Sequence, residues 1–180
     1  MDIMGSKIYL RYLKDTDVQA LLDLNLRNME FFQKYSPIHN DDFYTFEAQR
    51  KSISNMAEQR EKDRQYCFGI FTKDRNELIG DVSLFQIFRG ALESCLIGYS
   101  LDKQHNGKGY ATEAVSLAVR FAFDELKLHR IEAGVMLTNI GSMRVLEKVG
   151  FHKEGIAQKN VKINGQWEDH QILAIISDKN

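Results

Sequence analysis

The stretch that most constrains the fold of this chain is LDKQHNGKGYATEA, residues 101–114. It joins a strand-like segment, ALESCLIGYSL, to a helical one, YATEAVSLAVRFAFDEL, and a second strand-like segment, RIEAGVML, follows. A strand–helix–strand connection of this kind places its two strands parallel in one sheet. The unit across residues 92–137 therefore predicts an α/β fold with a parallel pair.

The rest of the chain predicts antiparallel strands and further helices. KIYLRYL, QYCFGIF and ELIGDVSLFQIF look like strands, and Asn164-Gly165 predicts a hairpin between the last two strands. KDTDVQALLDLNLRNMEFF predicts a helix capped by Asp15 or Thr16, and a second helix is expected over about residues 43–60. NIGSMRVLEKV predicts a short helix closed by Gly150. We expect a mixed, mostly antiparallel sheet of about seven strands, with helices on both faces.

Charge and cysteine content exclude several classes of partner. The 180 residues carry a formal net charge of −1, so no overall positive field attracts nucleic acid. No apolar stretch approaches the roughly 20 residues of a membrane-spanning helix, and the first residues lack a signal-peptide pattern. Cys67 and Cys95 belong to no metal or redox motif. We expect two buried free thiols in a cytoplasmic protein without a metal.

The glycine loop has the features of a phosphate site. A helix N-terminus leaves about four N–H groups without partners and carries about half a positive charge. Glycines allow positive φ and let a ligand touch the main chain, because no Cβ intervenes. Gln104, Gly107 and Gly109 form the pattern Q-x-x-G-x-G, with Lys103 and Lys108 beside them. This spacing suits a diphosphate held mainly by amides.

The two glycines are also compatible with roles that involve no diphosphate cradle of this kind. They can simply make a tight strand-to-helix turn. The P-loop pattern fails, because Gly109 follows Gly107-Lys108 where Ser or Thr is required. The dinucleotide fingerprint G-x-G-x-x-G fits its first two glycines, but Thr112 stands in place of the third. Glu132 lies near the expected distance for a ribose-binding acid, so this alternative is weakened rather than excluded.

Two motifs together resemble the GCN5-related N-acetyltransferase (GNAT) superfamily. Its pyrophosphate loop reads [QR]-x-x-G-x-[GA], which QHNGKG matches, and TNIGSMRVLEKVGF matches a second element through Asn139, Ser142, Gly150 and Phe151. IGYSLD, NIGSMRVLEKVGFHKEG and NGQWEDHQILA resemble the RimJ/RimL branch, which acetylates ribosomal-protein N-termini. The clear match covers about residues 77–176, and the first 65 residues agree in layout alone.

The resemblance implies a GNAT-like fold and direct transfer of an acetyl group from acetyl-CoA to a primary amine. In the family, the strand before the glycine loop splays from the next parallel strand, and the pantetheine arm enters the gap. Gly98 would ease this close approach, and Asn139 would reach the cofactor arm besides capping its helix. The cofactor-binding residues implied are Ile97, Gly98, Tyr99, Gln104, Asn106, Gly107, Lys108, Gly109, Tyr110, Ala111, Thr112 and Asn139.

The catalytic acid and base depart from the usual family pattern. Many members place a tyrosine acid four residues before the Gly of Gly-Phe, where this chain has Leu146. Ser142 stands where the RimL-like branch has a serine proposed for this role, so we expect Ser142 to be the acid. Related proteins often carry Glu where Leu96 stands, and we expect Glu93 to be the base, with Asp169 as a second candidate. For Ser142, the plainer alternative is a polar residue in the first turn of a helix. For each carboxylate, the plainer alternative is a solvated surface group.

We expect one acetyltransferase domain over residues 1–180. Residues 1–65 would form the acceptor side, 66–150 the cofactor-binding core, and 151–180 a C-terminal hairpin. The resemblance implies an acceptor with an N-terminal amine, similar to that of a ribosomal protein. We expect this protein to be a monomer or a homodimer. A polyamine or an aminoglycoside is an alternative acceptor. A CoA-binding sensor without activity is another alternative, which transfer of acetyl to any amine would exclude.

Overall fold

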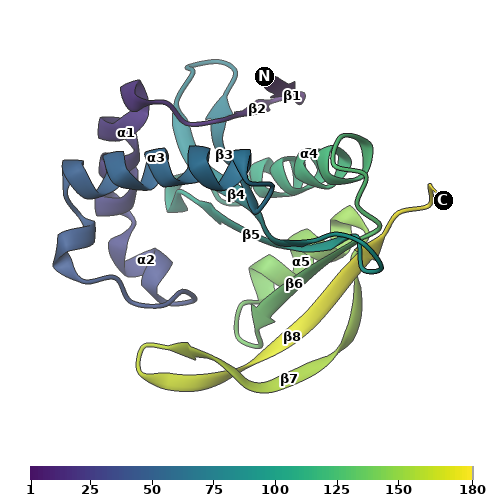
Figure 1. Cartoon of the computed structure of the whole chain (residues 1–180). Helices are drawn as coiled ribbons and strands as arrows, with labels where there is room; N and C mark the ends of the chain where they lie inside the picture. Colours follow the sequence, from purple (N-terminus) through teal and green to yellow (C-terminus); the bar gives the residue numbers. More distant parts are fainter. Residues whose placement is uncertain (180) are drawn as a thin grey trace.

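The chain folds around one eight-stranded sheet (Figure 1). The computed structural model describes residues 1–179. The strands are β1 (Asp2–Met4), β2 (Ile8–Arg11), β3 (Gln65–Thr72), β4 (Leu78–Phe88), β5 (Ser94–Leu101), β6 (Arg130–Met136), β7 (His152–Ile163) and β8 (Gln166–Ile176). Their order is β1-β2-β3-β4-β5-β6-β8-β7, and β5 and β6 are parallel while the other neighbours are antiparallel. The mixed, mostly antiparallel sheet and its parallel unit are thus confirmed.

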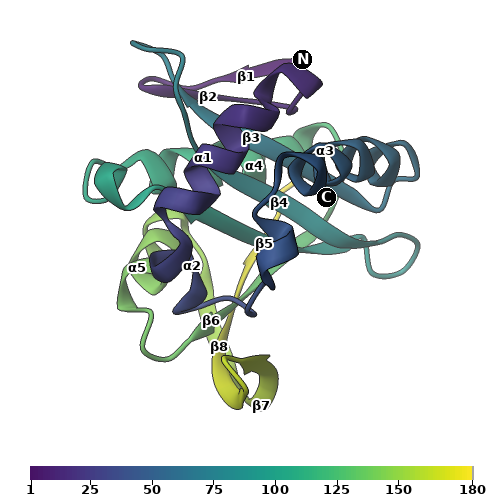
Figure 2. The same cartoon turned by 90° about the vertical axis from the view of Figure 1, so that its left-hand side faces the viewer.

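Helices cover both faces of this sheet. They are α1 (Val18–Arg27), α2 (Met29–Gln33), α3 (Phe46–Glu61), α4 (Tyr110–Asp124) and α5 (Ile140–Val149). Figure 2 shows α1 crossing one face and α4 behind the other. A large core joins α4 and α5 to the sheet, and a smaller one joins α1 and α3 to β3 and β4. Ala114, Ala118 and Ala122 are fully buried, which lets α4 approach the strands closely.

Two features near the N-terminus differ from the sequence prediction. β1 is an eighth strand that was not predicted, because its three residues are too few to show a period. Capping by Asp15 or Thr16 is also wrong, since Asp15–Asp17 form a 3₁₀ turn before α1. Asp17 explains this turn, because its carboxylate accepts hydrogen bonds from Arg11 (2.7 and 2.8 Å) and from the Lys14 N–H (2.8 Å).

The predicted first helix is divided at Asn28. This residue leaves the helical region, with φ −111° and ψ 12°. Its side chain is 2% exposed and makes two hydrogen bonds. Nδ2 donates to the Leu24 carbonyl (3.0 Å), and Oδ1 accepts from the N–H of Lys103 (3.0 Å). The side chain therefore closes α1 and turns the chain into α2, a tertiary effect that helix propensity does not report.

The parallel pair diverges along its length. Its register is Ser94–Arg130, Cys95–Ile131 and Leu96–Glu132, and no pairing follows although both strands continue. The edge of β5 that faces β6 is consequently unpaired beyond Leu96. Peptide groups in such a gap need other partners, so the gap is suited to a ligand that offers its own amides and carbonyls. α4 begins nine residues after the end of β5 and shares this end of the sheet.

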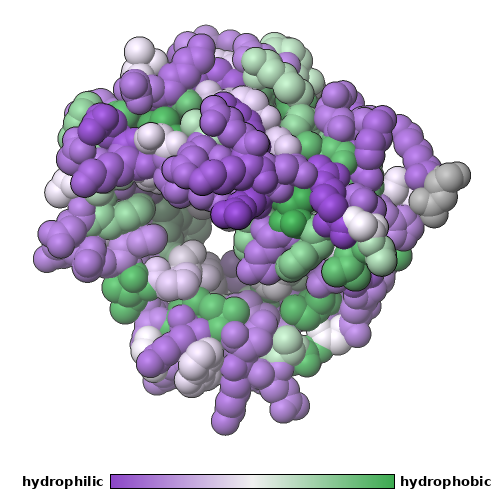
Figure 3. All heavy atoms as spheres, viewed as in Figure 1, coloured by the Kyte–Doolittle hydropathy of each residue, from purple (hydrophilic) through white to green (hydrophobic). Residues whose placement is uncertain are grey.

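The β7–β8 hairpin reaches back toward α2. Its turn has Asn164 at φ 49° and Gly165 at φ 82°, which confirms the predicted hairpin. Asn164 Nδ2 donates to the carbonyl of Gln33 at the end of α2 (3.0 Å). The space-filling view shows an opening near the centre of the molecule, between α2 and α5 (Figure 3). The hairpin and α2 thus border this opening from one side.

Candidate active site

A cavity of about 530 Å³ lies at the end of β5 where the two parallel strands have separated. Four elements form its wall: α2, the end of β5, the glycine loop with the start of α4, and α5. The lining residues include Phe31, Phe32, Tyr35, Tyr99, Ser100, Leu101, Asn106, Gly107, Gly109, Tyr110, Ala111, Thr112, Asn139 and Ser142. Most of the residues predicted to bind the cofactor are thereby brought together.

The glycine loop presents main chain to the cavity. Gly107 and Gly109 have φ values of 77° and 83°, a region in which a side chain is strained. Gly109 is the N-cap residue of α4 and offers no side chain to the first-turn N–H groups. No neighbouring atom lies within 4 Å of a Cβ built on either glycine. The helix terminus therefore keeps free donors and a positive dipole end beside the cavity, which suits an anion.

The end of α1 holds this loop in place. Asp102, with a side chain that is 2% exposed, pairs with Arg27 (2.7 Å) and accepts the N–H of Gln104 (3.1 Å). Asn28 accepts the N–H of Lys103. Burial by itself raises the pKa of Asp102, but the hydrogen bonds from Arg27 and Gln104 outweigh it and bring the pKa below the usual value. Sequence reasoning missed this support, because Arg27 and Asp102 are 75 positions apart.

A pair of hydroxyl groups stands on the opposite wall. Tyr99 Oη lies 2.7 Å from Ser142 Oγ and donates to the carbonyl of Ser142 at 3.1 Å. Asn139 accepts the N–H of Ser142 (3.3 Å), so it caps α5 and also lines the cavity. Burial raises the pKa of Tyr99 to about 12, which keeps the phenol protonated at neutral pH. Leu146, in place of the usual tyrosine, is fully buried in the core.

The carboxylates predicted as bases lie elsewhere. Glu93 precedes β5 at φ 38°, where its carboxylate accepts the N–H of Gly90 (3.0 Å) and pairs with Arg89 (3.4 Å). Asp169 accepts the N–H of Lys159 (2.8 Å) within the hairpin. Neither lines the cavity. Both are occupied in bracing turns, so the structure offers no geometric support for either as the base.

Four predicted cofactor residues also lie outside the wall of the cavity. Ile97 is 4% exposed and packs in the main core. Gly98 faces Phe85, whose ring lies 3.3 Å from a Cβ built on the glycine. Gln104 and Lys108 belong to the loop without lining the cavity, and the carbonyl of Lys108 accepts a hydrogen bond from Lys7 Nζ (3.2 Å).

Aromatic side chains from α2 and the residues just after it complete the wall of the cavity. Phe31, Phe32 and Tyr35 line it, and Gln33 between them receives the hairpin contact. Sequence reasoning did not assign these rings a role, although MEFFQKY places three aromatic residues within seven positions. They make this wall apolar, which favours contact with the carbon skeleton of a bound partner.

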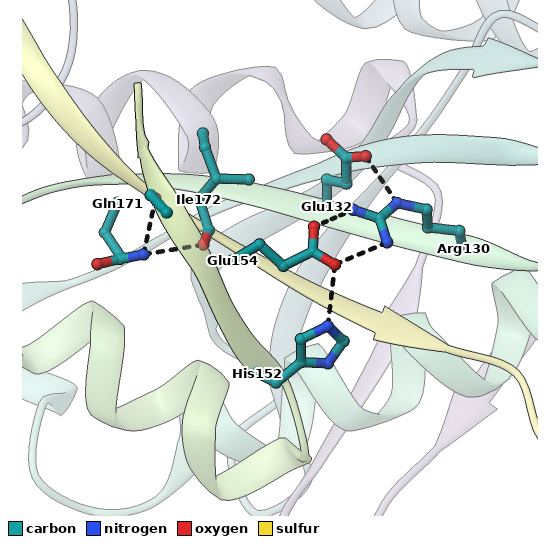
Figure 4. A network of polar contacts seen from close by, with 7 residues as sticks. Arg130, Glu132, His152, Glu154, Gln171 and Ile172 are labelled. Carbon is teal, nitrogen blue, oxygen red and sulfur yellow. Dashed lines mark hydrogen bonds and ion pairs between the residues drawn. The ribbon is translucent and has the colours of Figure 1, made fainter. Parts of the chain in front are cut away.

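A second polar network holds the closed end of the parallel pair (Figure 4). Arg130 begins β6 and donates to both carboxylate oxygens of Glu154 on β7, across β8. It also donates to Glu132 (2.7 Å), and His152 contacts Glu154 at 3.0 Å. The hydrogen bonds from Arg130, and next that from His152, lower the pKa of Glu154 to about 2. The network ties β6 to β7 across β8, at the end of the sheet where β5 and β6 still pair.

Metal-binding clusters and membrane-spanning helices are both absent from residues 1–179. No group of three His, Cys, Asp or Glu side chains there is placed to hold a metal ion. No helix in the same range is both long and apolar enough to cross a membrane. Cys67 and Cys95 are buried and unpaired, as predicted.

Comparison with known proteins gives a consistent assignment. The family model described as Acetyltransferase (GNAT) domain matches residues 7–152. The probable N-acetyltransferase YjcK of Bacillus subtilis is 62% identical over 175 residues, covering 97% of each chain. The ribosomal-protein-S5-alanine acetyltransferase of Vibrio fischeri is 30% identical, with a TM-score of 0.93 over 99% of this chain and 98% of its own. RimJ of Mycobacterium smegmatis, solved with CoA-disulfide, is 27% identical, with a TM-score of 0.91 over 96% and 83%.

Proposed function

This chain belongs to the GNAT family of acetyl-CoA-dependent N-acetyltransferases, and we propose that it acetylates a protein N-terminal amine. The observation that carries the proposal is the position of the cavity, between the unpaired edge of β5 and the glycine loop. The likeness to an enzyme that acts on a ribosomal-protein alanine supports this type of acceptor. The two buried free thiols support a cytoplasmic location as part of the same proposal.

The cofactor would lie along the two open main-chain surfaces. The amides of Gly107, Gly109 and the first turn of α4 would hold the diphosphate. The pantetheine arm carries two amide groups, which would pair with the unpaired edge of β5 from Ile97 onward. Asn139, at the start of α5, would contact the arm from the other side. This placement would bring the thioester between β5 and α5, near Ser142, which lines the cavity.

The chemistry is direct attack of the amine on the thioester carbonyl. The nitrogen forms a bond to the carbonyl carbon, the carbon–sulfur bond breaks, and the amine loses one proton while the sulfur gains one. Ser142 would donate its hydroxyl proton to the leaving sulfur and take up the phenol proton of Tyr99, which would turn from the Ser142 carbonyl toward Ser142 Oγ. The phenolate would regain its proton from solvent. Burial, which raises the pKa of Tyr99 to about 12, keeps this phenol protonated at neutral pH, so its hydrogen is present when the sulfur leaves.

An N-terminal amine matches the acceptor side. Its pKa is near 8, so a useful fraction is unprotonated at neutral pH. The aromatic wall of Phe31, Phe32 and Tyr35 offers contact area for the first side chains of a peptide. The opening in Figure 3 lies beside α2, and the contact of Asn164 with Gln33 joins the hairpin to that helix. A chain terminus can enter such an opening more easily than the middle of a folded chain.

Calorimetric titration with acetyl-CoA, followed by a free-thiol assay in the same sample, tests the proposal. The acceptors would be an N-terminal peptide of ribosomal protein S5, the same peptide with its terminus blocked, spermidine and an aminoglycoside. We expect tight binding of acetyl-CoA. Thiol release should follow with the free-terminus peptide and should be absent with the blocked peptide. Release with spermidine or the aminoglycoside instead would establish a small-amine enzyme. Tight binding without release on any amine would favour a CoA sensor.

A further inference from the structure

We propose that Ser100 and Asp81 take up the proton that the acceptor amine loses. Ser100 would contact the amine nitrogen, and Asp81 would act through Ser100 as a positioning residue that holds the proton. This inference rests on the proposed acetyl transfer. It fills the role for which Glu93 and Asp169 are not placed.

The pair joins the cavity to the interior of the sheet. Ser100 and Asp81 face each other on β5 and β4, and Ser100 Oγ donates a hydrogen bond to Asp81 Oδ1. Ser100 lines the cavity, whereas Asp81 does not. The serine is therefore the group that a bound amine can meet, and the carboxylate stands directly behind it.

The pair also lies on the acceptor face of the sheet. Side chains alternate along β4, and its neighbours Val82 and Leu84 point into the core beneath α4 and α5. Asp81 therefore points to the opposite face, which α1 and α3 cover. α2, with its aromatic wall, follows α1 directly in the chain. A base on this face can reach an amine that enters past α2, while the acid pair of Tyr99 and Ser142 stands toward α5.

The surroundings of Asp81 keep it available as a base. No ion pair joins Asp81 to a cation within residues 1–179, in contrast to Asp17 and Asp102. The thiol of Cys67 on β3 interacts electrostatically with Asp81, and the hydroxyl of Ser100 faces the carboxylate from β5. Burial raises the pKa of Asp81, against the effect of the hydrogen bond from Ser100. A carboxylate in such a site binds a proton more readily than one in water.

The proton transfer is balanced within the pair. After the amine attacks, its nitrogen carries an extra proton. Ser100 Oγ accepts that proton as its own hydroxyl proton moves to Asp81 Oδ1, so the serine ends unchanged and the carboxylate becomes a carboxylic acid. The acid returns its proton to solvent after the product leaves. No further reactant is required.

Steady-state kinetics of Asp81→Asn and Ser100→Ala test the proposal, with Ser83→Ala as the matched control. Ser83 lies on β4 two residues from Asp81, contacts Gln65 (3.5 Å), and lies outside the cavity. We expect kcat at pH 7 to fall about 10- to 100-fold in both variants and less than about twofold in the control. The Kd of acetyl-CoA should stay within about twofold of wild type, and the double variant should be no worse than the poorer single one.

Two further readouts distinguish a proton acceptor from a merely structural pair. Raising the pH to 9.5 should recover much of the kcat that Asp81→Asn loses, because solvent base can then accept the proton of the amine without Asp81. Ser100→Thr keeps the hydroxyl and should retain at least about one third of the wild-type kcat. A structural defect would give a loss that is equal at both pH values. If Asp81→Asn does not fold, the comparison of Ser100→Ala with Ser100→Thr decides.

Three outcomes would overturn the inference. Wild-type kcat in Ser100→Ala and Asp81→Asn would remove the pair from the reaction while leaving the proposed function intact. A loss in Ser100→Ala that Ser100→Thr shares would indicate packing. A wild-type protein that binds acetyl-CoA but releases no thiol with any amine would overturn the proposed function and this inference with it.

Discussion

The hydroxyl oxygens of Tyr99 and Ser142 lie 2.7 Å apart on the wall of the cavity and join β5 to α5. Position 146, where the resemblance to the family implies a tyrosine, holds a leucine that is fully buried. Tyr99 brings a phenol to the same cavity from a strand instead of a helix. A hydrogen-bonded pair of hydroxyl groups therefore lines the cavity.

Removing either hydroxyl should slow the reaction without removing the cofactor. We expect Tyr99→Phe and Ser142→Ala to lower kcat about 10- to 100-fold, with the Kd of acetyl-CoA changed less than about threefold. Tyr66→Phe is the control, since that phenol bonds Asp63 (2.8 Å) outside the cavity. Stopped thiol-release assays and calorimetry measure the two quantities. Equal kcat in all three variants would contradict the role of the pair.

Glycines at positive φ allow the loop's binding role to be separated from its folding role. Ala at 107, 109 or 90 meets the same strain, because Gly90 has φ 74° and equally open surroundings. Each substitution should cost about 1 kcal/mol of unfolding free energy. Gly107→Ala and Gly109→Ala should also weaken CoA binding by at least about tenfold, whereas Gly90→Ala should leave it unchanged. Loss of binding in Gly90→Ala would mean that stability alone explains the effect.

Breaking the support beneath the loop should weaken binding from a distance. Arg27→Ala leaves Asp102 buried without its partner, so we expect about 1–3 kcal/mol of destabilisation and CoA binding several-fold weaker. Arg50→Ala is the control, because that exposed arginine pairs with Glu47 on α3 and should cost less than about 0.5 kcal/mol. Chemical unfolding and calorimetry give both values. An Arg27→Ala variant with wild-type binding would show that the loop holds its shape without α1.

The Glu154 network should make stability depend on acid. The pKa of Glu154 is about 2 in the fold and about 4.3 in the unfolded chain. Its ionised form therefore contributes fully to the free energy of unfolding above about pH 4.3, and this contribution is lost as the pH falls toward about 2. Glu154→Gln should therefore lower the Tm at pH 7, and the difference from wild type should shrink below pH 4. Glu61→Gln, on the exposed end of α3, is the control for the substitution itself. Thermal unfolding between pH 2 and 7 measures this, and a constant difference would contradict the linkage.

Local sequence signals predicted much of the fold. Gly150, at φ 114°, ends α5 as expected, and Asn164-Gly165 makes the predicted turn, because both depend on backbone preferences of single residues. The parallel unit followed from the order strand, loop, helix, strand. Asn28 was not predicted to end a helix, because its partner Lys103 is distant in sequence.

The candidate site shows the same contrast between local sequence signals and contacts distant in sequence. The glycine loop and Ser142 came from contiguous motifs, and both line the cavity. The braces of the loop, the α2 aromatics and the Ser100–Asp81 pair each require knowledge of which strands and helices are neighbours. Glu93 was an expectation from position along a strand, but its φ of 38° turns it into the β4–β5 connection. A one-dimensional pattern does not report such a turn of the backbone.

Mass spectrometry of an acceptor peptide after reaction with acetyl-CoA tests the central claim most directly. The peptide would carry a free N-terminus and one internal lysine, with a blocked-terminus copy as the control. We predict one acetyl group on the α-amine of the free peptide and none on either lysine. Acetylation of the peptide only at its lysine would contradict a protein N-terminal acceptor. An unmodified peptide under conditions in which spermidine is fully acetylated would contradict it as well.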